Sequence, residues 1–231
     1  MEFKNYKNMI ERPYIVYADC ECSLIPTNEK YNIAKHVPNS ACFFLVCSYD
    51  AMQNVMWQAT GEDCVAKMVV ELDSLAKKCI EKMKAILPMQ LTRLELTLHF
   101  QATRCHICSR PFQGDNDPRG FKVKDHCHLT GNYRGAAHNK CNFYFFCNRF
   151  LPVVMHNLKG YDSHLIIKEA FTINKALGDR KIDAIPNSYE KFMSITIGDL
   201  RFIDSCQFMA SSLEKLVENL YDKISLRTLS I

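Results

Sequence analysis

The sequence predicts an α/β fold in two pieces, with a small metal-binding segment inserted between them. Short runs of β-branched and aromatic residues surround a long amphipathic pattern in the first hundred residues, and similar runs return after residue 150. Between them, cysteine, histidine, glycine and basic residues become frequent. The predicted parts are therefore 1–100, 101–149 and 150–231, of which the outer two form one domain.

The first piece begins with strands and continues into a helix. We predict a strand at 13–22 and two further strands at 41–49 and 54–59, joined as a hairpin around Asp50. From Glu62 to Leu87, apolar residues recur at steps of three and four, which indicates a long amphipathic helix.

Local signals mark the ends of this helix, and the last piece repeats the alternation of strands and helices. Thr60 and Asp63 approximate a capping box at its start, and Pro88 marks its end. After the insert, the pattern predicts a strand, a helix, a β-hairpin and a helix, at 150–157, 163–171, 188–198 with 200–204, and 211–223.

Composition fits a folded globular protein, since the chain has 231 residues, 48% of them apolar, and a net charge of +4. This charge allows an anionic partner such as nucleic acid but does not predict one by itself. The chain begins MEFKNYKNMIERPY, without an apolar leader, and no apolar run reaches the roughly 20 residues of a membrane span. We therefore expect the twelve cysteines to be reduced in an intracellular, soluble protein without a membrane partner, and leave open whether it is nuclear or cytoplasmic.

Two pairs of soft ligands in the insert predict a structural zinc site. Cys105 and Cys108 form one pair with two residues between them, and His138 and Cys141 form the other. Two such pairs complete a tetrahedral site with no open position. Zinc can contribute on the order of 10 kcal/mol to the folding of a small segment. The alternative is that these are unrelated buried side chains.

The residues between and after the pairs carry a resemblance to a nuclease family. Asp125, His126 and His128 stand in the run DHCH, and Asn142 follows the last zinc ligand. Over about residues 103–143 this order resembles phage recombination endonuclease VII and, more broadly, the ββα-metal (His-Asn-His) nucleases, although that family usually has cysteine where this chain has His138.

The resemblance implies a small ββα fold in which Asp125 and Asn142 bind a catalytic Mg²⁺ or Mn²⁺ ion. It also implies that either His126 or His128 is the general base, and it does not decide between them. The alternative is a zinc-stabilised structural insert without catalysis.

Two acidic residues in YADCEC suggest a second metal site. Asp19 and Glu21 lie two positions apart on the first predicted strand, so their side chains share one face of the sheet. Neighbouring carboxylates repel each other unless a cation lies between them. A solvent-facing edge strand would give the same pattern.

Together with HNLKGYDSHL at 156–165, this run resembles the first two exonuclease motifs of family B DNA polymerases, especially the protein-primed branch of viral and Maverick/Polinton-type enzymes. The resemblance implies a ribonuclease H-like sheet carrying a 3′–5′ exonuclease site, with Mg²⁺ or Mn²⁺ bound by Asp19, Glu21 and Asp162. It further implies contacts to the single-stranded 3′ end of DNA, from His156, Asn157 and Tyr161, and from Ser212 and Leu213 in SSLEKL. A capped amphipathic helix explains SSLEKL equally well.

The family's third exonuclease motif, Tyr-x3-Asp, has no match, because the fourth residue after Tyr221 is Ser225. Asp204 is a weak substitute, since it precedes SSLEKL. The polymerase palm is also missing. The main hypothesis is therefore an N-terminal exonuclease fragment of a protein-primed DNA polymerase, feeble alone, whose intact form would have a terminal protein as partner.

Two other functions stay open. In one, the zinc segment is a DNA endonuclease. In the other, the chain binds nucleic acid without catalysis, through a basic run on phosphates: Arg104, Arg110, Arg119, Lys122, Lys124, Arg134 and Lys140.

Overall fold

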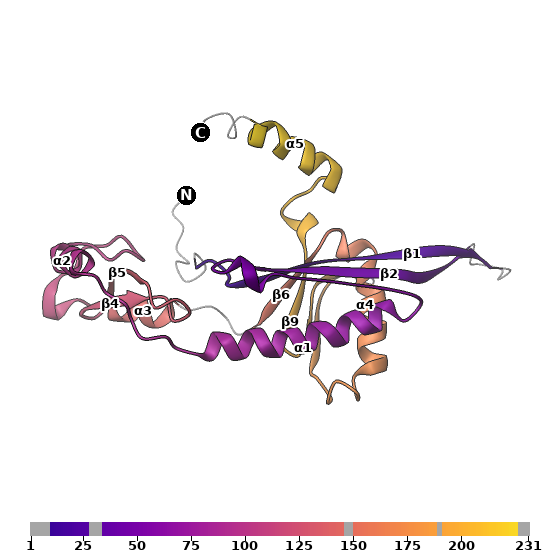
Figure 1. Cartoon of the computed structure of the whole chain (residues 1–231), viewed down its shortest axis with the longest axis horizontal. Helices are drawn as coiled ribbons and strands as arrows, with labels where there is room; N and C mark the ends of the chain where they lie inside the picture. The colour runs from indigo at the N-terminus through magenta and orange to yellow at the C-terminus, as the bar shows by residue number, and fades with distance from the viewer. Residues whose placement is uncertain (1–9, 28–33, 146–149, 189–190, 226–231) are drawn as a thin grey trace. The chain divides into compact units, whose positions relative to one another are not determined.

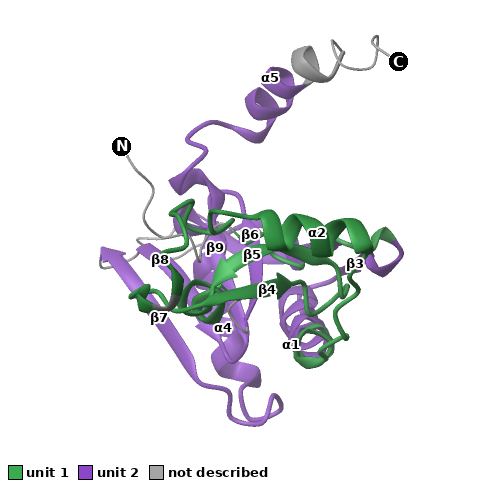
Figure 2. Cartoon of the chain, turned by 90° about the vertical axis from the view of Figure 1, so that its left-hand side faces the viewer, with its two compact units in different colours: residues 1–13, 48–51, 77–149 green, residues 14–47, 52–76, 150–231 purple. Residues whose placement is uncertain are grey.

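The computed structural model describes residues 10–27, 34–145, 150–188 and 191–225. Contacts divide the chain into two compact units, shown in Figure 2. Unit 1 comprises 1–13, 48–51 and 77–149, and unit 2 comprises 14–47, 52–76 and 150–231. Cys147 and Ile231 lie outside the described residues. None of the helices in the described ranges combines the length and the apolar character that crossing a membrane requires.

Unit 2 is built on a mixed sheet of seven strands in the order β3-β2-β1-β6-β9-β8-β7. Figure 1 labels β1, β2, β6 and β9 of this sheet. The strands are β1 (Tyr14–Pro26), β2 (Ala34–Cys47), β3 (Val55–Thr60), β6 (Leu151–Met155), β7 (Ile182–Ser188), β8 (Lys191–Ile197) and β9 (Leu200–Asp204). Parallel pairing joins β6 to β1 and to β9, and the other neighbours are antiparallel. The helices are α1 (Cys64–Lys84), which continues into unit 1, α4 (Asp162–Ile173) and α5 (Leu213–Ser225), with short 3-10 turns η2 (Ala51–Gln53), η4 (Leu158–Gly160) and η5 (Ser205–Gln207).

The core of unit 2 follows from alternation in the strands and periodicity in α1. Val16 and Ala18 of β1 are buried, whereas Tyr17 between them is 51% exposed. In α1, Met68 and Leu72 are completely buried and lie four residues apart, on one face of the helix. The predicted α/β class and the long helix are therefore confirmed.

Unit 1 contains a small hairpin followed by a helix, in ββα order. Its elements are α2 (Arg93–Gln101), η3 (Gly114–Asn116), β4 (Lys122–His126), β5 (Tyr133–His138) and α3 (Asn139–Tyr144). The two strands are antiparallel, and their register shifts between Asp125 and His126. Such a β-bulge re-aims side chains and is frequent beside functional sites.

Several local features differ from the predictions. Helix α2 was not predicted, although Thr92 and Glu95 form a complete capping box at its start. Asp63, expected in a capping box with Thr60, precedes α1 and forms an ion pair with Lys67 at 2.9 Å. Strand β7 was also not predicted, because Pro186 interrupts its β-favouring pattern.

Candidate metal centre and carboxylate site

Four side chains of unit 1 form a compact group of soft ligands. One ligand atom each from Cys105, Cys108, His138 and Cys141 lies within 4.8 Å of the others, and no other such group of three or more occurs among the described residues. His138 Nδ1 is 3.5 Å from Cys108 Sγ and 3.8 Å from Cys141 Sγ. Three thiols and an imidazole in a closed cluster are a donor set typical of structural zinc. The predicted ligands are brought together and could bind one zinc ion.

The backbone explains how the two pairs meet. Cys105 N–H donates to Arg110 O (2.9 Å) and Ser109 N–H donates to Cys105 O (2.8 Å), with Ser109 at φ 58°. This left-handed residue closes a tight turn that carries the first pair. The second pair lies at the junction of β5 and α3, where His138 N–H donates to Cys105 Sγ (3.4 Å).

His138 has a carboxylate on the side of its ring away from the thiols. Its Nε2 lies 2.9 Å from Asp117 Oδ2, although the geometry does not satisfy that of a hydrogen bond. Both side chains are at most 1% exposed, so the Asp117 carboxylate is an immediate, buried neighbour of this ring nitrogen. The Arg119 guanidinium, which donates to Asp117 Oδ1 at 2.9 Å, holds the pKa of Asp117 well below its usual range. Asp117 is therefore an anion beside the imidazole.

Asp125, a predicted catalytic residue, is enclosed in a charged network. Its Oδ2 accepts from His106 Nε2 at 2.8 Å, its Oδ1 accepts from Arg134 Nη2 at 2.6 Å, and it is 1% exposed. Gly135 makes room for this arrangement, since a Cβ there would lie 2.7 Å from His106 Cγ. Burial alone raises the pKa of Asp125, but the bonds from His106 and Arg134 outweigh it and lower that pKa.

His126 and His128 follow at the bulge, with ring centroids 4.9 Å apart. Although His128 is exposed as a whole, partial burial of its ring lowers its pKa, and the charges of His126 and Arg134 act in the same direction. An imidazole that is neutral near pH 7 can accept a proton. Asn142 is half-buried in α3, directly after Cys141.

Most side chains of the basic run are engaged within unit 1. Carboxylates pair with Arg119 and Arg134. Three others donate to backbone carbonyl oxygens: Arg104 to Ser109, Lys122 to the last residues of α2, and Lys140 to Pro118. Of the seven, only the side chains of Arg110 and Lys124 have no ion pair or hydrogen bond with a described residue.

In unit 2, Asp19 and Glu21 project from the exposed face of β1, as the alternation predicted. They line one pocket, whose other members come from β2 and β3: Ser40, Ala41, Cys42, Gln58, Ala59 and Thr60. Asp162 does not line that pocket.

Asp162 is the first residue of α4 and is 5% exposed, and its Oδ1 has no hydrogen-bond partner within the described ranges. Burial raises the pKa of Asp162 to about 7, and the nearby charges of Asp19 and Glu21 add to this effect. The three carboxylates therefore share an electrostatic environment, although they do not form a group within 4.8 Å. A buried carboxylate without a donor is stabilised by a cation. A divalent-ion site at these three residues therefore stays a prediction.

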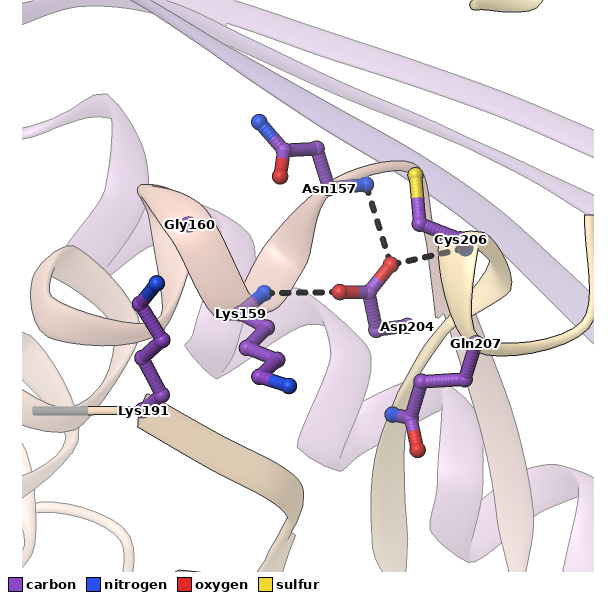
Figure 3. A pocket seen from close by; sticks show the side chains of 7 residues that line it. All are labelled: Asn157, Lys159, Gly160, Lys191, Asp204, Cys206 and Gln207. Carbon is purple, nitrogen blue, oxygen red and sulfur yellow. Dashed lines mark hydrogen bonds between the residues drawn. The ribbon is translucent and has the colours of Figure 1, made fainter. Parts of the chain in front are cut away.

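Asp204 holds the loop that leads to Asp162 (Figure 3). Its Oδ1 accepts from the backbone N–H groups of Asn157 (3.0 Å) and Cys206 (2.9 Å), and its Oδ2 accepts from that of Lys159 (3.0 Å). Within the same loop, a Cβ on Gly160 would lie 2.5 Å from Asn157 Oδ1. Asp204 thus has both oxygens engaged in positioning the loop.

Two residues expected to contact DNA are engaged in the same region. His156 Nδ1 lies 2.8 Å from Ser205 Oγ and its Nε2 lies 2.9 Å from Ser211 O, so the ring links the end of β6 to the segment before α5. The Tyr161 hydroxyl hydrogen-bonds to His36 Nδ1 on β2. Burial, followed by a hydrogen bond with a nearby thiol, raises the pKa of Tyr161.

The predicted Ser-Leu motif lies at the start of α5. Lys215 N–H donates to Ser212 Oγ at 3.3 Å, as in an N-cap. Leu213 is 53% exposed. The capped-helix interpretation therefore describes this segment, and its contact with DNA stays a prediction.

Sequence reasoning assigned no role to His106, Asp117 or His36. His106 stands inside the Cys105–Cys108 pair, so the spacing carried a signal that it lies near the centre. Asp117 and His36 reach their partners from a loop and from a distant strand, and no local pattern indicates either contact.

Comparison with known proteins gives one match. Residues 81–152 match the family model of recombination endonuclease VII. No curated protein and no solved structure matches the chain. The matched segment contains the four side chains that could bind zinc, together with Asp125, His126, His128 and Asn142. This endonuclease VII-like segment supports a nuclease or nucleic-acid-binding role.

Proposed function

We propose that the protein is a DNA endonuclease in which the zinc-organised segment supplies the catalytic histidines. The single observation that carries this proposal is the match of residues 81–152 to recombination endonuclease VII. Unit 1 supports it by bringing the rings of His126 and His128 together, directly after the bulge at the end of β4, on a hairpin whose other strand carries His138 of the Cys/His cluster. Zinc has a structural role here, because four protein ligands leave no position for water.

In this proposal either His126 or His128 accepts a proton from the attacking water. The lowered pKa of His128 favours its neutral form, which a general base requires. Asp125 orients Arg134 and His106 through its two oxygens. A divalent ion at Asp125 and Asn142 would have to share that carboxylate with the donors Arg134 and His106, so no step of this proposal uses a metal ion there.

Cleavage of branched and linear duplex DNA by the full chain in Mg²⁺ or Mn²⁺ tests this proposal. We expect His126→Ala or His128→Ala to slow cleavage by about 10²- to 10⁴-fold, the usual contribution of a general base. Asp19→Ala is the matched control in unit 2 and should leave cleavage unchanged. Cleavage that neither histidine variant affects would contradict the proposal. DNA binding without cleavage would favour the non-catalytic alternative.

A second candidate centre is the carboxylate site of unit 2, as a 3′–5′ exonuclease of the protein-primed polymerase type. The buried, unpartnered Asp162 beside Asp19 and Glu21 favours it, and a mixed sheet with β1, β6 and β9 parallel supports the ribonuclease H-like expectation. The comparisons lend no support to a polymerase, so a terminal protein partner rests on the motifs alone.

A divalent ion bound by Asp19, Glu21 and Asp162 would stabilise the charge that develops on a phosphate. Shortening of a 5′-labelled single strand tests this second centre. Asp162→Asn should abolish it and His126→Ala should not. The reverse pattern would assign the activity to unit 1.

A further inference from the structure

A pocket with two lysines lies beside the loop between β6 and α4 (Figure 3). The figure labels the residues that line it: Asn157, Lys159, Gly160, Lys191, Asp204, Cys206 and Gln207. None of these side chains is aliphatic or aromatic. Pockets for cofactors and other small molecules are mostly apolar, because burial of apolar surface supplies much of their affinity. Carbon atoms nevertheless form most of the lining surface, so a charged ligand would be bound by the ammonium groups of the two lysines.

The charge of the pocket is positive. The oxygens of Asp204 already accept three backbone hydrogen bonds, from Asn157, Lys159 and Cys206. Neither Lys159 nor Lys191 forms an ion pair with any carboxylate in the described part of the chain. Lys159 is half-buried, and a partly desolvated cation gains from an anionic partner.

The position of the pocket connects it to the carboxylate site of unit 2. Strands β6 and β9 are parallel, with Met155 opposite Asp204, so the pocket lies where both strands end. Ligands of open α/β sheets bind outside the carboxyl ends of parallel strands. Lys159 precedes Asp162 by three residues in the same loop and helix start.

We propose that Lys159 and Lys191 bind a backbone phosphate of a nucleic-acid strand next to the carboxylate site. Lysine is a point-charge ligand for phosphate and needs no fixed geometry, which suits two long side chains that line one pocket. Gln207 Nε2 donates to Met193 O (2.7 Å) and so joins η5 to the strand that carries Lys191. The inference deepens the proposed nucleic-acid role and rests on it.

Salt-dependent binding of the full chain to a fluorescent twelve-nucleotide oligothymidine tests the inference. Lys159→Gln combined with Lys191→Gln should weaken binding and reduce the slope of log affinity against log salt by about 0.7 for each phosphate that the variant no longer neutralises. Lys159→Arg with Lys191→Arg should restore the slope, since both cations remain. Lys168→Gln with Lys175→Gln is the matched control, because these lysines do not line the pocket.

The possible results distinguish failure of the phosphate site from failure of the nucleic-acid role. A slope that changes only in the pocket variant, and returns with arginine, supports the phosphate site. Wild-type binding with an unchanged slope in the pocket variant overturns the site and leaves the nucleic-acid role standing. No binding by the wild type overturns both. If the double variant does not fold by circular dichroism, the single variants Lys159→Gln and Lys191→Gln decide by the same slope.

Discussion

Units 1 and 2 each contain a buried carboxylate at the predicted position of a nuclease motif, but the surroundings of the two carboxylates shift their pKa values in opposite directions. Asp125 is enclosed with two side-chain donors, Arg134 and His106, and its pKa is lowered. Asp162 is enclosed beside two other carboxylates, its Oδ1 has no donor among the described residues, and its pKa is raised to about 7. Burial is similar in the two cases, so the neighbours decide the direction.

Asp125 is therefore a carboxylate that stabilises the fold through its own donors, whereas Asp162 is one whose ionised form requires a bound cation. Asp125 already has its counter-charges and contributes to the folding of unit 1. Asp162 costs folding free energy when it ionises, unless a metal ion is bound. A sequence motif therefore predicts where a carboxylate lies. The charges around that carboxylate in the fold indicate whether it can bind a metal ion.

The largest effect is expected from breaking the zinc cluster that supports Asp125. Cys108→Ser removes one ligand from a site whose binding energy is on the order of 10 kcal/mol, so unit 1 should unfold while unit 2 stays folded. Hydrogen exchange resolved along the sequence measures this, with a zinc chelator as the second perturbation. Cys42→Ser, outside the cluster, is the matched control. Retained protection of β4 and β5 in Cys108→Ser would show that the fold does not depend on zinc.

The next effect concerns Asp162. Between pH 4 and 7 the unfolded carboxyl has lost its proton while the folded one keeps it, so the free energy of unfolding falls as pH rises. The step from the ordinary pKa of 3.8 to about 7 corresponds to up to about 4 kcal/mol. Asp162→Asn should therefore be more stable than the wild type at pH 7.5, with the difference closing toward pH 4, measured by urea unfolding.

Asp183→Asn is the control for this prediction, because Asp183 belongs to the same unit and its carboxylate is exposed. Mg²⁺ should raise the melting temperature of the wild type at pH 7.5 and leave Asp162→Asn unchanged. A variant less stable than the wild type throughout this pH range would mean that Asp162 has a counter-charge.

Asp125 should respond with the opposite sign. Asp125→Asn leaves Arg134 and His106 without their anion and should cost about 2 kcal/mol at neutral pH, because both partners are partly exposed. Since the folded pKa lies below that of the unfolded chain, this stabilisation exists above pH 4 and disappears as pH falls through the folded pKa. Urea unfolding at several pH values measures it.

A matched ion pair on the surface calibrates the effect of Asp125. Asp63→Asn breaks the exposed pair with Lys67 and should cost less than about 0.5 kcal/mol. Equal losses in the two variants would show that enclosure adds nothing to the Asp125 network.

Spacing and periodicity predicted much of both units. Within each ligand pair only two residues separate the ligands, so a tight turn can bring them together. The alternation in β1 places Asp19 and Glu21 on one face. Helix α2 was missed although its capping box could be read from Thr92 and Glu95.

Other features depend on contacts that no local pattern encodes. Asp204 accepts from the N–H of Asn157, 47 positions away, and these partners meet only when β6 and β9 pair. The basic run shows a different limit of the sequence. The sequence identified the basic residues, but it did not show that most of their side chains form hydrogen bonds or ion pairs within unit 1. Lys122, for example, donates to three carbonyl oxygens near the end of α2.

The last prediction concerns Asp117 and compares two carboxylates within unit 1, since Asp117, like Asp125, lies beside a nitrogen of a histidine ring. A carboxylate next to the outer nitrogen of a zinc-bound histidine fixes its tautomer, so Asp117→Asn should weaken zinc binding by about 10- to 100-fold in a chelator competition. Asp117 also holds Arg119, which is a purely structural role. The background variant His138→Cys separates the two, because a thiolate has no outer nitrogen. A loss of affinity that is equally large in that background would assign Asp117 to the loop and not to the imidazole.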